Sequence, residues 1–256
     1  MKIRFLGAHN TESRDTRLVS LLIDDVLALD AGGLTSGLSF DEQLQLKAVL
    51  LTHQHYDHVR DIPALGMNLF LRQASIDVYS ILSVGDTLRK HMLNGRVYSA
   101  FMQGNDGGEV IRFHTVEPYK EVEIAGYKVL PLPVAHAVKA VGYQVSSPAG
   151  DSLFFTGDTG PGLSRLWQYI EPQIIVAEVT ATDRFEQFGR DKGHLTPCLL
   201  KQELMAFKRE KGYLPPVATV HMNPALEQEI AAELVGVAAE LGTSITPAAE
   251  GDQLCL

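Results

Sequence analysis

Short hydrophobic runs separated by turn residues dominate the beginning and the middle of this chain. Residues 2–6, 18–23 and 26–30 predict an opening antiparallel meander, with Asp24 and Asp25 as a tight turn. A second series of strands is predicted at residues 110–116, 121–124, 127–132, 140–146 and 152–156. Further short strands are predicted at residues 48–51, 76–79, 174–178 and 217–220.

Helical segments follow strands in both halves of the chain. Residues 64–72, just after Pro63, and residues 83–93 predict helices in the first half. In the second half, Pro197 suits the first position of a helix that runs to about Glu210, with Thr196 as its N-cap. Pro224 suits the start of a final helix over residues 225–240. This order of strands followed by helices predicts an α/β protein in which two sheets pack face to face with helices outside.

Residues 94–109 interrupt the regular pattern. Several glycines punctuate this segment, and Tyr98, Phe101 and Met102 lie between them. A segment of this composition is expected to be a lid, a contact between subunits or a plain surface excursion.

The composition fits a globular protein with a sizeable core. The 256 residues, 45% of them hydrophobic, are enough for one large α/β domain or two small ones. No apolar run approaches the roughly 20 residues of a membrane-spanning helix, and we expect no signal peptide and no membrane partner. The two cysteines, Cys198 and Cys255, are far apart and form no CxxC pair, so reduced thiols and a cytoplasmic location are expected.

The net charge of the chain indicates which classes of partner to expect. The chain has 22 basic and 31 acidic residues, which gives a net charge of −9. Broad nucleic-acid binding depends on Lys and Arg side chains that neutralise phosphates, so an extended nucleic acid is not the expected partner. A small anionic substrate is compatible with this charge, because bound metal ions reverse the local field.

The densest group of candidate metal ligands follows the apolar run at residues 48–51. Four side chains of the segment His53-Gln54-His55-Tyr56-Asp57-His58 can bind a metal. His53 and His55 can share one face of an extended segment, whereas Asp57 and His58 come where the chain turns into a helix. The two pairs can therefore point at two different metal ions. Imidazole and carboxylate groups suit zinc, manganese or iron.

Three later residues each follow a predicted strand. These are His136, Asp158 and His221. A single histidine after an apolar run is more often a hydrogen-bonded core residue than a ligand. Strand ends at one edge of a sheet converge in space, however, so their shared placement favours a common site.

The motif His53-x-His55-x-Asp57-His58, followed by His136, Asp158 and His221, resembles the metallo-β-lactamase fold hydrolases. The resemblance extends over nearly the whole chain. It implies a four-layer αββα sandwich of two mixed β-sheets flanked by helices, formed by residues 1–256 as a single domain. It also implies that His53, His55 and His136 bind a first metal ion, that Asp57, His58 and His221 bind a second, and that Asp158 bridges both.

This ligand set is consistent with hydrolysis of a phosphodiester. Two divalent ions about 3.5–4 Å apart turn a bridging water into hydroxide near neutral pH, and this hydroxide would attack the substrate. The two ions, the two aspartates and the hydroxide sum to a charge of about +1, which suits a singly charged diester. Two Zn²⁺ ions are expected, with Mn²⁺ or Fe²⁺ as alternatives.

A second set of motifs narrows the resemblance to the phosphodiesterase branch. Glu178-Val179-Thr180 and Gly193-His194-Leu195-Thr196-Pro197 resemble ribonuclease Z and the class II cyclic-nucleotide phosphodiesterases. The second motif and His221-Met222-Asn223-Pro224 look closer to the cyclic-nucleotide enzymes. The resemblance implies that His194 faces the scissile phosphate, where it could protonate the leaving oxygen. Glu178 could orient His194, or it could be a carboxylate on the surface. Asp57, His194 and Glu178 are the catalytic candidates.

Other functions share the same ligand set. RNA 3′-end processing is one alternative, but the basic Gly/Pro-rich arm typical of ribonuclease Z is absent from this sequence. Hydrolysis of a thioester or a lactone is another, and a metal-binding regulatory protein without turnover is a third. The expected substrate is a small anionic phosphodiester, and homodimers are common among proteins that resemble this family.

Several other polar residues could have either a role at the predicted site or a purely structural role. Asp30 could hydrogen-bond a ligand histidine or simply end a strand, and His9 is expected in a turn. His91 and His114 lack ligand spacing and are expected to be structural. The arginines that could contact phosphate are Arg60, Arg184 and Arg190, although single arginines are usually solvated.

Overall fold

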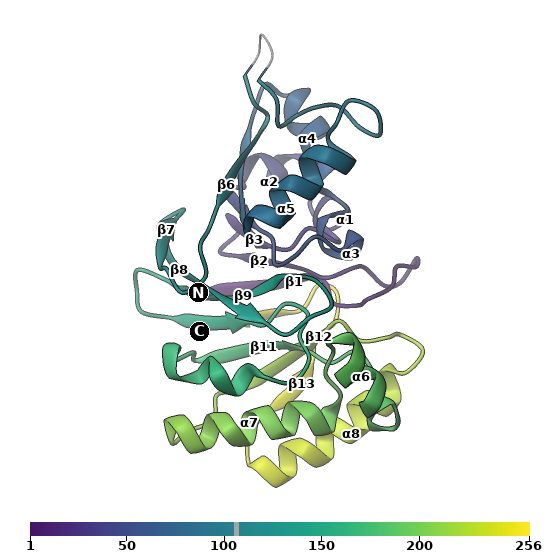
Figure 1. Ribbon diagram of the computed structural model, residues 1–256, viewed down its shortest axis with the longest axis vertical. Coiled ribbons are helices and arrows are strands. Elements are labelled where there is room, and N and C mark those ends of the chain that lie inside the picture. Colours follow the sequence, from purple (N-terminus) through teal and green to yellow (C-terminus); the bar gives the residue numbers. More distant parts are fainter. Residues whose placement is uncertain (105–107) are drawn as a thin grey trace.

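Two β-sheets lie face to face, and helices cover the outer face of each (Figure 1). The computed structural model describes residues 1–104 and 108–256. Both sheets contain parallel and antiparallel pairs. This arrangement confirms the four-layer αββα sandwich that the sequence motifs predict.

The first sheet has seven strands within the described ranges. Its spatial order is β14 (Gln253–Cys255), β1 (Lys2–Gly7), β2 (Ser20–Ile23), β3 (Leu27–Leu29), β4 (Ala48–Leu50), β5 (Ile76–Ser80) and β6 (Ile111–Thr115). The strands β1, β2 and β3 form the predicted antiparallel meander. Asp24 and Asp25 connect β2 to β3 with positive φ angles of 47° and 61°, as the tight turn of a hairpin requires. The strands from β3 to β6 are parallel.

The second sheet also has seven strands within the same ranges. Its spatial order is β13 (Ile245–Pro247), β12 (Val217–Val220), β11 (Ile174–Glu178), β10 (Ser152–Phe155), β9 (Ala140–Ser146), β8 (Tyr127–Val134) and β7 (Val122–Ile124). The strands from β10 to β13 are parallel. Because β8 and β10 are both antiparallel to β9, they run in the same direction. The ends of β8, β10, β11 and β12 therefore lie at one edge of this sheet.

The helices divide between the two outer faces. The first half of the chain contributes α1 (Leu34–Gly37), α2 (Phe40–Gln45), α3 (Tyr56–Val59), α4 (Ile62–Phe70) and α5 (Leu82–Thr87), which continues as a π-helix at Leu88–Met92. The second half contributes α6 (Glu186–Lys192), α7 (Pro197–Lys211) and α8 (Glu227–Leu241). Thr196 caps α7 as predicted, because its side chain accepts a hydrogen bond from the Leu199 N–H.

Two predicted helix starts are wrong by a few residues. The first of these helices, α4, begins at Ile62 rather than after Pro63, because the first turn of a helix tolerates proline. The last helix, α8, begins at Glu227 rather than at residue 225. The Asn223 side chain accepts a hydrogen bond from the Ala225 N–H, and this turn precedes the helix.

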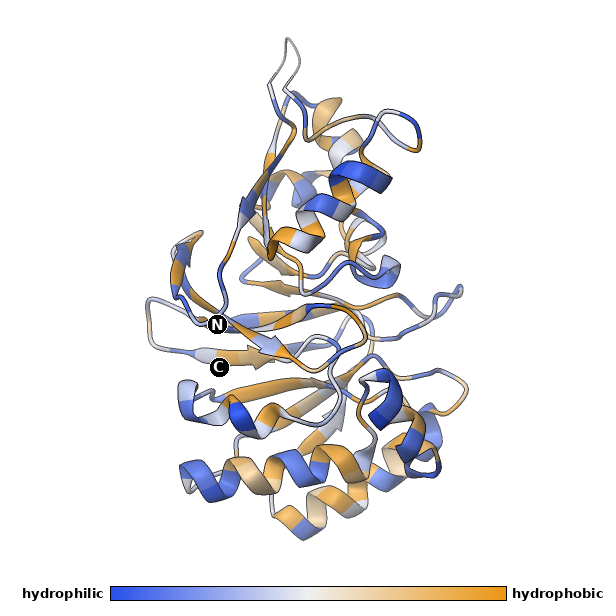
Figure 2. Ribbon diagram, viewed as in Figure 1, coloured by the Kyte–Doolittle hydropathy of each residue, from blue (hydrophilic) through white to orange (hydrophobic). Residues whose placement is uncertain are grey.

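Hydrophobic residues fill the space between the layers. One cluster contains residues of both sheets, such as Leu50 and Phe155, together with Leu65 of α4 and Val84 of α5. A second cluster, which contains Trp167 and Phe207, packs the second sheet against α7 and α8. In Figure 2 the strands of the second sheet are mostly orange, whereas α6 is mostly blue. The sheets therefore supply much of the hydrophobic core, and the candidate metal ligands lie in the loops at their edges.

The irregular segment predicted at residues 94–109 is only partly described. Residues 105–107 lie outside the described residues. In the described part, Phe101 and Met102 are buried in the first cluster, and the ring centroid of Phe101 lies 5.8 Å from that of Phe70 in α4. Their burial anchors this part of the segment to the body of the protein.

Candidate metal centre

The loop after β4 brings four candidate ligands to the edge of the first sheet. His55 is extended, with φ −63° and ψ 147°, and α3 begins directly after it. The helical turn directs Asp57 and His58 back toward the strand ends, so Asp57 Oδ2 lies 3.4 Å from His58 Nε2. The His53 and His58 side chains are fully buried. The predicted change from extended chain to helix at this motif is therefore confirmed.

The other three candidates come from the second sheet. His136 follows β8, Asp158 follows β10 and His221 follows β12. A hydrogen bond of 3.0 Å from the Val141 N–H to the Thr52 carbonyl oxygen joins the two sheets beside these loops. The structure thus places all seven predicted residues at one shared edge.

The seven side chains form two overlapping groups. His53, His55 and His136 make one group with Asp158, and Asp57, His58 and His221 make the other with the same Asp158. The candidate ligand atoms in each group lie within 4.8 Å of one another. Asp158 lies 3.2 Å from His58 Nε2 and 3.3 Å from His221 Nε2 through its two carboxylate oxygens. This is the division into two sites with one shared carboxylate that the family resemblance implies.

The donor atoms of these groups fit divalent metal ions. The Nε2 atoms of His53 and His58 are buried, and although carboxylate oxygens lie near them, no contact with the described residues has the geometry of a hydrogen bond. Buried polar atoms nearly always have a partner, and a metal ion is the partner that suits a cluster of imidazole nitrogens and carboxylate oxygens. The histidine and aspartate clusters therefore suit a dinuclear metal site.

Hydrogen bonds to the Nδ1 atoms fix the orientation of several candidate ligand histidines. His136 Nδ1 donates to the carbonyl oxygen of Gly193 over 2.9 Å, which leaves Nε2 on the side of the cluster. Gly193 has a φ of +77°, and a Cβ atom there would lie 2.7 Å from His136 Cα. The glycine of the Gly-His-Leu-Thr-Pro motif is therefore needed for this close approach. Thr52 Oγ1 and Thr180 Oγ1 contact Nδ1 of His53 and of His221, at 3.0 and 2.8 Å.

Burial and neighbouring charges shift the pKa values of the ligands. Burial lowers the pKa of His53, His55 and His136, so these rings are neutral, as metal binding requires. Burial alone would raise the pKa of Asp158, but the neighbouring His221 and His58 hold it well below its usual range. Burial alone would lower the pKa of His58, yet the carboxylates of Asp158 and Asp30 raise it. A metal ion would take the place of the proton that these carboxylates attract.

The role of Asp30 is to position His58. Its carboxylate is fully buried, and Oδ2 lies 2.7 Å from His58 Nδ1. It also accepts hydrogen bonds from the backbone N–H and the hydroxyl of Thr52. Of the two interpretations of Asp30, the contact with a candidate ligand is therefore confirmed. Asp30 and His221 both have positive φ, at 57° and 65°, a strained conformation for residues other than glycine that is often found at functional sites.

Replacing Asp30 should weaken metal binding at the second site. We expect Asp30→Ala to lower metal affinity by roughly 10- to 100-fold, because His58 Nδ1 would lose the carboxylate that fixes its ring. The affinity would be measured by competition with a chromophoric zinc chelator. Asp77→Ala, which removes a partly exposed carboxylate from β5, serves as the control. Unchanged affinity in a folded Asp30→Ala protein would contradict the positioning role.

Glu178 and His194 form a hydrogen-bonded pair beside the cluster. Glu178 ends β11 with 1% of its surface exposed, so the interpretation as a surface carboxylate is wrong. Its Oε1 lies 2.8 Å from His194 Nδ1. The His194 ring centroid lies 5.4 Å from that of His221 and 5.1 Å from that of His136. Burial alone would lower the pKa of His194, but the Glu178 carboxylate raises it to about 9.

The contacts of Thr180 with the site residues were not predicted from the sequence. Its hydroxyl donates to Glu178 Oε2 over 2.8 Å and lies 3.2 Å from His194 Nδ1. The same hydroxyl contacts His221 Nδ1, so Thr180 connects the His194–Glu178 pair to the second group of ligands. A hydroxyl two residues after a strand-end carboxylate is too common a pattern to predict this contact.

The remaining polar candidates have partners outside the cluster. His9 is buried, with Nδ1 2.7 Å from Glu250 Oε1. Exposed His114 contacts Asp77 at 2.7 Å. Each arginine considered as a phosphate ligand pairs with a glutamate: Arg60 with Glu12, Arg184 with Glu229 and Arg190 with Glu186.

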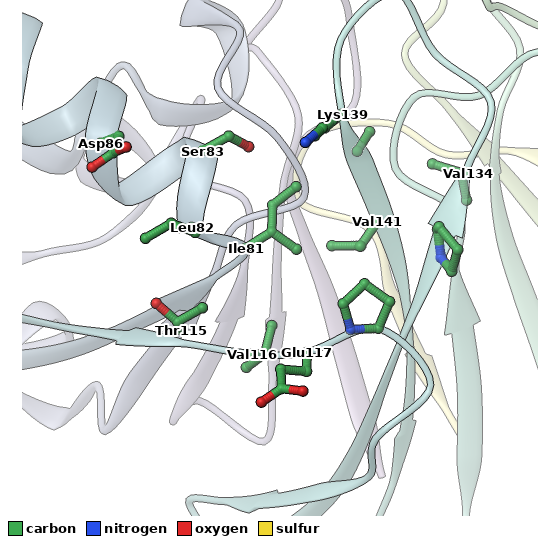
Figure 3. Close-up of a pocket in the computed structure, with 13 residues that line it drawn as sticks. Ile81, Leu82, Ser83, Asp86, Thr115, Val116, Glu117, Val134, Lys139 and Val141 are labelled. Atoms are coloured by element: carbon green, nitrogen blue, oxygen red, sulfur yellow. The ribbon is translucent and has the colours of Figure 1, made fainter.

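Two cavities flank the loops that carry the cluster. The larger, of about 630 Å³, lies between the ends of β5 and β6 and the adjoining ends of β8 and β9 (Figure 3). Its walls include Ile81, Leu82 and Val141, together with the charged side chains of Asp86, Glu117 and Lys139. His136 lies in the loop between β8 and β9, next to this cavity. The second cavity, of about 250 Å³, includes Thr180 in its wall.

A family model and several curated proteins match this chain. A family model described as "Beta-lactamase superfamily domain" matches residues 28–238. A protein of Myxococcus xanthus named UPF0173 metal-dependent hydrolase is 29% identical over 141 residues, which cover 52% of this chain and 46% of that protein. A Ribonuclease Z of Bradyrhizobium diazoefficiens is 26% identical over an alignment of 273 positions, which covers 86% of this chain and 85% of that protein. The chain spans about half the length of the first curated relatives that it matches.

Solved structures share the fold at lower identity. The structure of unliganded yeast PDE1 superposes with a TM-score of 0.86 and 16% identity, and the match covers 100% of this chain and 99% of that one. In the part of the chain that the structure describes, no helix has the length and apolar character that crossing a bilayer requires.

Proposed function

This chain belongs to the β-lactamase superfamily of metal-dependent hydrolases, and we propose that it hydrolyses a small phosphodiester, with a cyclic nucleotide as the favoured substrate. The observation that carries the proposal is the His194–Glu178 pair beside the two groups of ligands. Departure of an alkoxide from phosphorus needs a proton donor, and a histidine held by a carboxylate is a suitable one. The resemblance of the Gly-His-Leu-Thr-Pro segment to the cyclic-nucleotide enzymes supports the same substrate class.

Different residues of the chain would bind the metal ions and donate the proton in this reaction. Two divalent ions, for which zinc is our proposal, would supply a hydroxide nucleophile near neutral pH and charge that attracts the phosphate. His53, His55 and His136 would hold one ion, Asp57, His58 and His221 the other, and Asp158 both. Glu178 accepts the Nδ1 hydrogen of His194, which leaves Nε2 to donate a proton to the leaving oxygen. Buried Glu178 thus keeps His194 oriented and protonated.

A phosphodiesterase assay tests this proposal directly. We expect zinc- or manganese-loaded protein to hydrolyse bis(p-nitrophenyl) phosphate above the rate of an Asp158→Ala blank. Turnover would then be compared for adenosine 3′,5′-cyclic phosphate and for a thioester. A protein that carries its metal ions yet cleaves the thioester and neither diester would overturn the proposal.

RNA 3′-end processing is the second candidate. The match to a Ribonuclease Z over 86% of this chain favours it. The net charge of −9 disfavours it, because tRNA binding depends on cationic contacts with phosphates. Tight and salt-sensitive binding of a tRNA precursor would support this function over hydrolysis of a small diester.

A further inference from the structure

An aromatic pocket lies next to His194. We call it the Phe188 pocket; it has a volume of about 250 Å³ and is lined by Asn10, Thr180, Ala181, Phe185, Phe188, Asn223 and Leu226. Phe185 and Phe188 are 41% and 47% exposed, although both are large apolar side chains. Exposed aromatic rings grouped around a cavity are typical of a binding site for an apolar or planar group.

The pocket shares contacts with the candidate proton donor. The Phe188 and His194 rings are nearly parallel, with an angle of 9° between planes and 6.4 Å between centroids. Thr180, which lines the pocket, contacts both His194 and His221. A group bound in this pocket would therefore lie on the side of the site where the leaving oxygen accepts its proton.

The walls of the pocket specify the chemistry of its occupant. Its lining residues are all uncharged, so the matching group is neutral. The phenylalanine side chains favour an occupant with a planar ring, because the two rings can stack. Asn10, Asn223 and Thr180 add polar side chains to the wall. Amide and hydroxyl groups can hydrogen-bond the edge of a nucleobase.

The larger cavity in Figure 3 has a different character. Its apolar walls are aliphatic or proline side chains, and it also contains Asp86, Glu117 and Lys139. No aromatic ring lines it among the described residues. A neutral planar ring is therefore better matched by the Phe188 pocket.

We propose that the Phe188 pocket binds the nucleobase of the substrate, so that the diester carries a nucleoside on the side of its leaving oxygen. This inference rests on the proposed function, because it assumes that the phosphate lies at the metal centre. Phe188 would then determine specificity by stacking on the base.

Measuring equilibrium binding tests the nucleobase site independently of hydrolytic activity. Isothermal titration calorimetry of zinc-loaded protein would compare adenosine 5′-monophosphate with ribose 5-phosphate, which has a hydroxyl group in place of the base. We expect the wild type to bind the nucleotide roughly tenfold or more tightly, from stacking of one base. Phe188→Ala should reduce this ratio to about one, whereas Phe188→Tyr should retain most of it.

Leu82→Ala in the larger cavity is the positional control. Leu82 is 61% exposed, and its truncation should leave the ratio unchanged. Equal affinity of the two compounds in the wild type, including no detectable binding of either, would overturn the inference. So would an unchanged ratio in Phe188→Ala, or a ratio lost in Leu82→Ala. Calorimetry needs no turnover, so failure of diester hydrolysis would count against the proposed function alone.

Discussion

Asp158→Ala should abolish hydrolysis, with a loss of more than about 10³-fold in rate, and should also lower the metal content of the purified protein. The physical reason is the shared position of this carboxylate. It belongs to both groups of ligands and lies between 3.2 and 3.9 Å from Nε2 of four histidines. Removal of one carboxylate would therefore weaken both metal sites. Rates would be measured with bis(p-nitrophenyl) phosphate, and metal content by inductively coupled plasma mass spectrometry.

Two further variants make the Asp158 experiment decisive. Asp158→Asn keeps the shape of the side chain without its charge, so we expect a loss close to that of Asp158→Ala. Asp41→Ala removes an exposed aspartate from the first turn of α2 and should leave both rate and metal content near those of the wild type. An Asp158→Ala protein that retains its full metal content and half of its activity would refute the bridging role.

His194→Ala should slow hydrolysis in a way that depends on the leaving group. With adenosine 3′,5′-cyclic phosphate, whose leaving alkoxide needs a proton, we expect a fall in kcat of about 10²- to 10⁴-fold. With bis(p-nitrophenyl) phosphate the fall should be much smaller, because p-nitrophenolate departs without protonation. The pair of kcat ratios, wild type over variant, is the measurement.

The controls for His194 come from its partner and from a distant histidine. Glu178→Gln keeps a hydrogen bond to Nδ1 but removes the charge, so its kcat should fall by an intermediate amount. His114→Ala, on the exposed end of β6, should have no effect on either substrate. An equal loss with both substrates in His194→Ala would indicate a structural role and would contradict proton donation.

The fold and the positions of the ligands were largely predictable from the sequence. Runs of β-branched and aliphatic residues marked most strands, and the seven candidate ligands each followed a strand end or lay in one loop. Shorter elements were not predicted. Residues 186–192 have the polar sequence EQFGRDK without helical periodicity, and β13 and β14 have three residues each. Local patterns this short carry little information, and tertiary contacts decide their conformation.

The supporting contacts of the site could not be predicted from local sequence. Whether Asp30 ends a strand or holds a histidine depends on the pairing of β3 with β4, which places it beside Thr52 and His58. Glu178 looked like a surface residue by its chemistry, and only packing of the loops around β11 buries it. The Phe188 pocket likewise joins residues near positions 10, 185 and 223.

The pairing of β14 with β1 constrains the order in which the molecule can assemble during synthesis. Lys2 is paired with Cys255, so β1 gains this neighbour only once β14 has been synthesised. Until then β1 has a free edge that can pair with other chains, which is a risk for aggregation. The ligands extend from His53 to His221, so metal ions can complete the centre only after the segment that carries His221 has emerged. The full set of metal ligands is therefore available only after His221 has been synthesised, and earlier folding steps proceed without the complete centre.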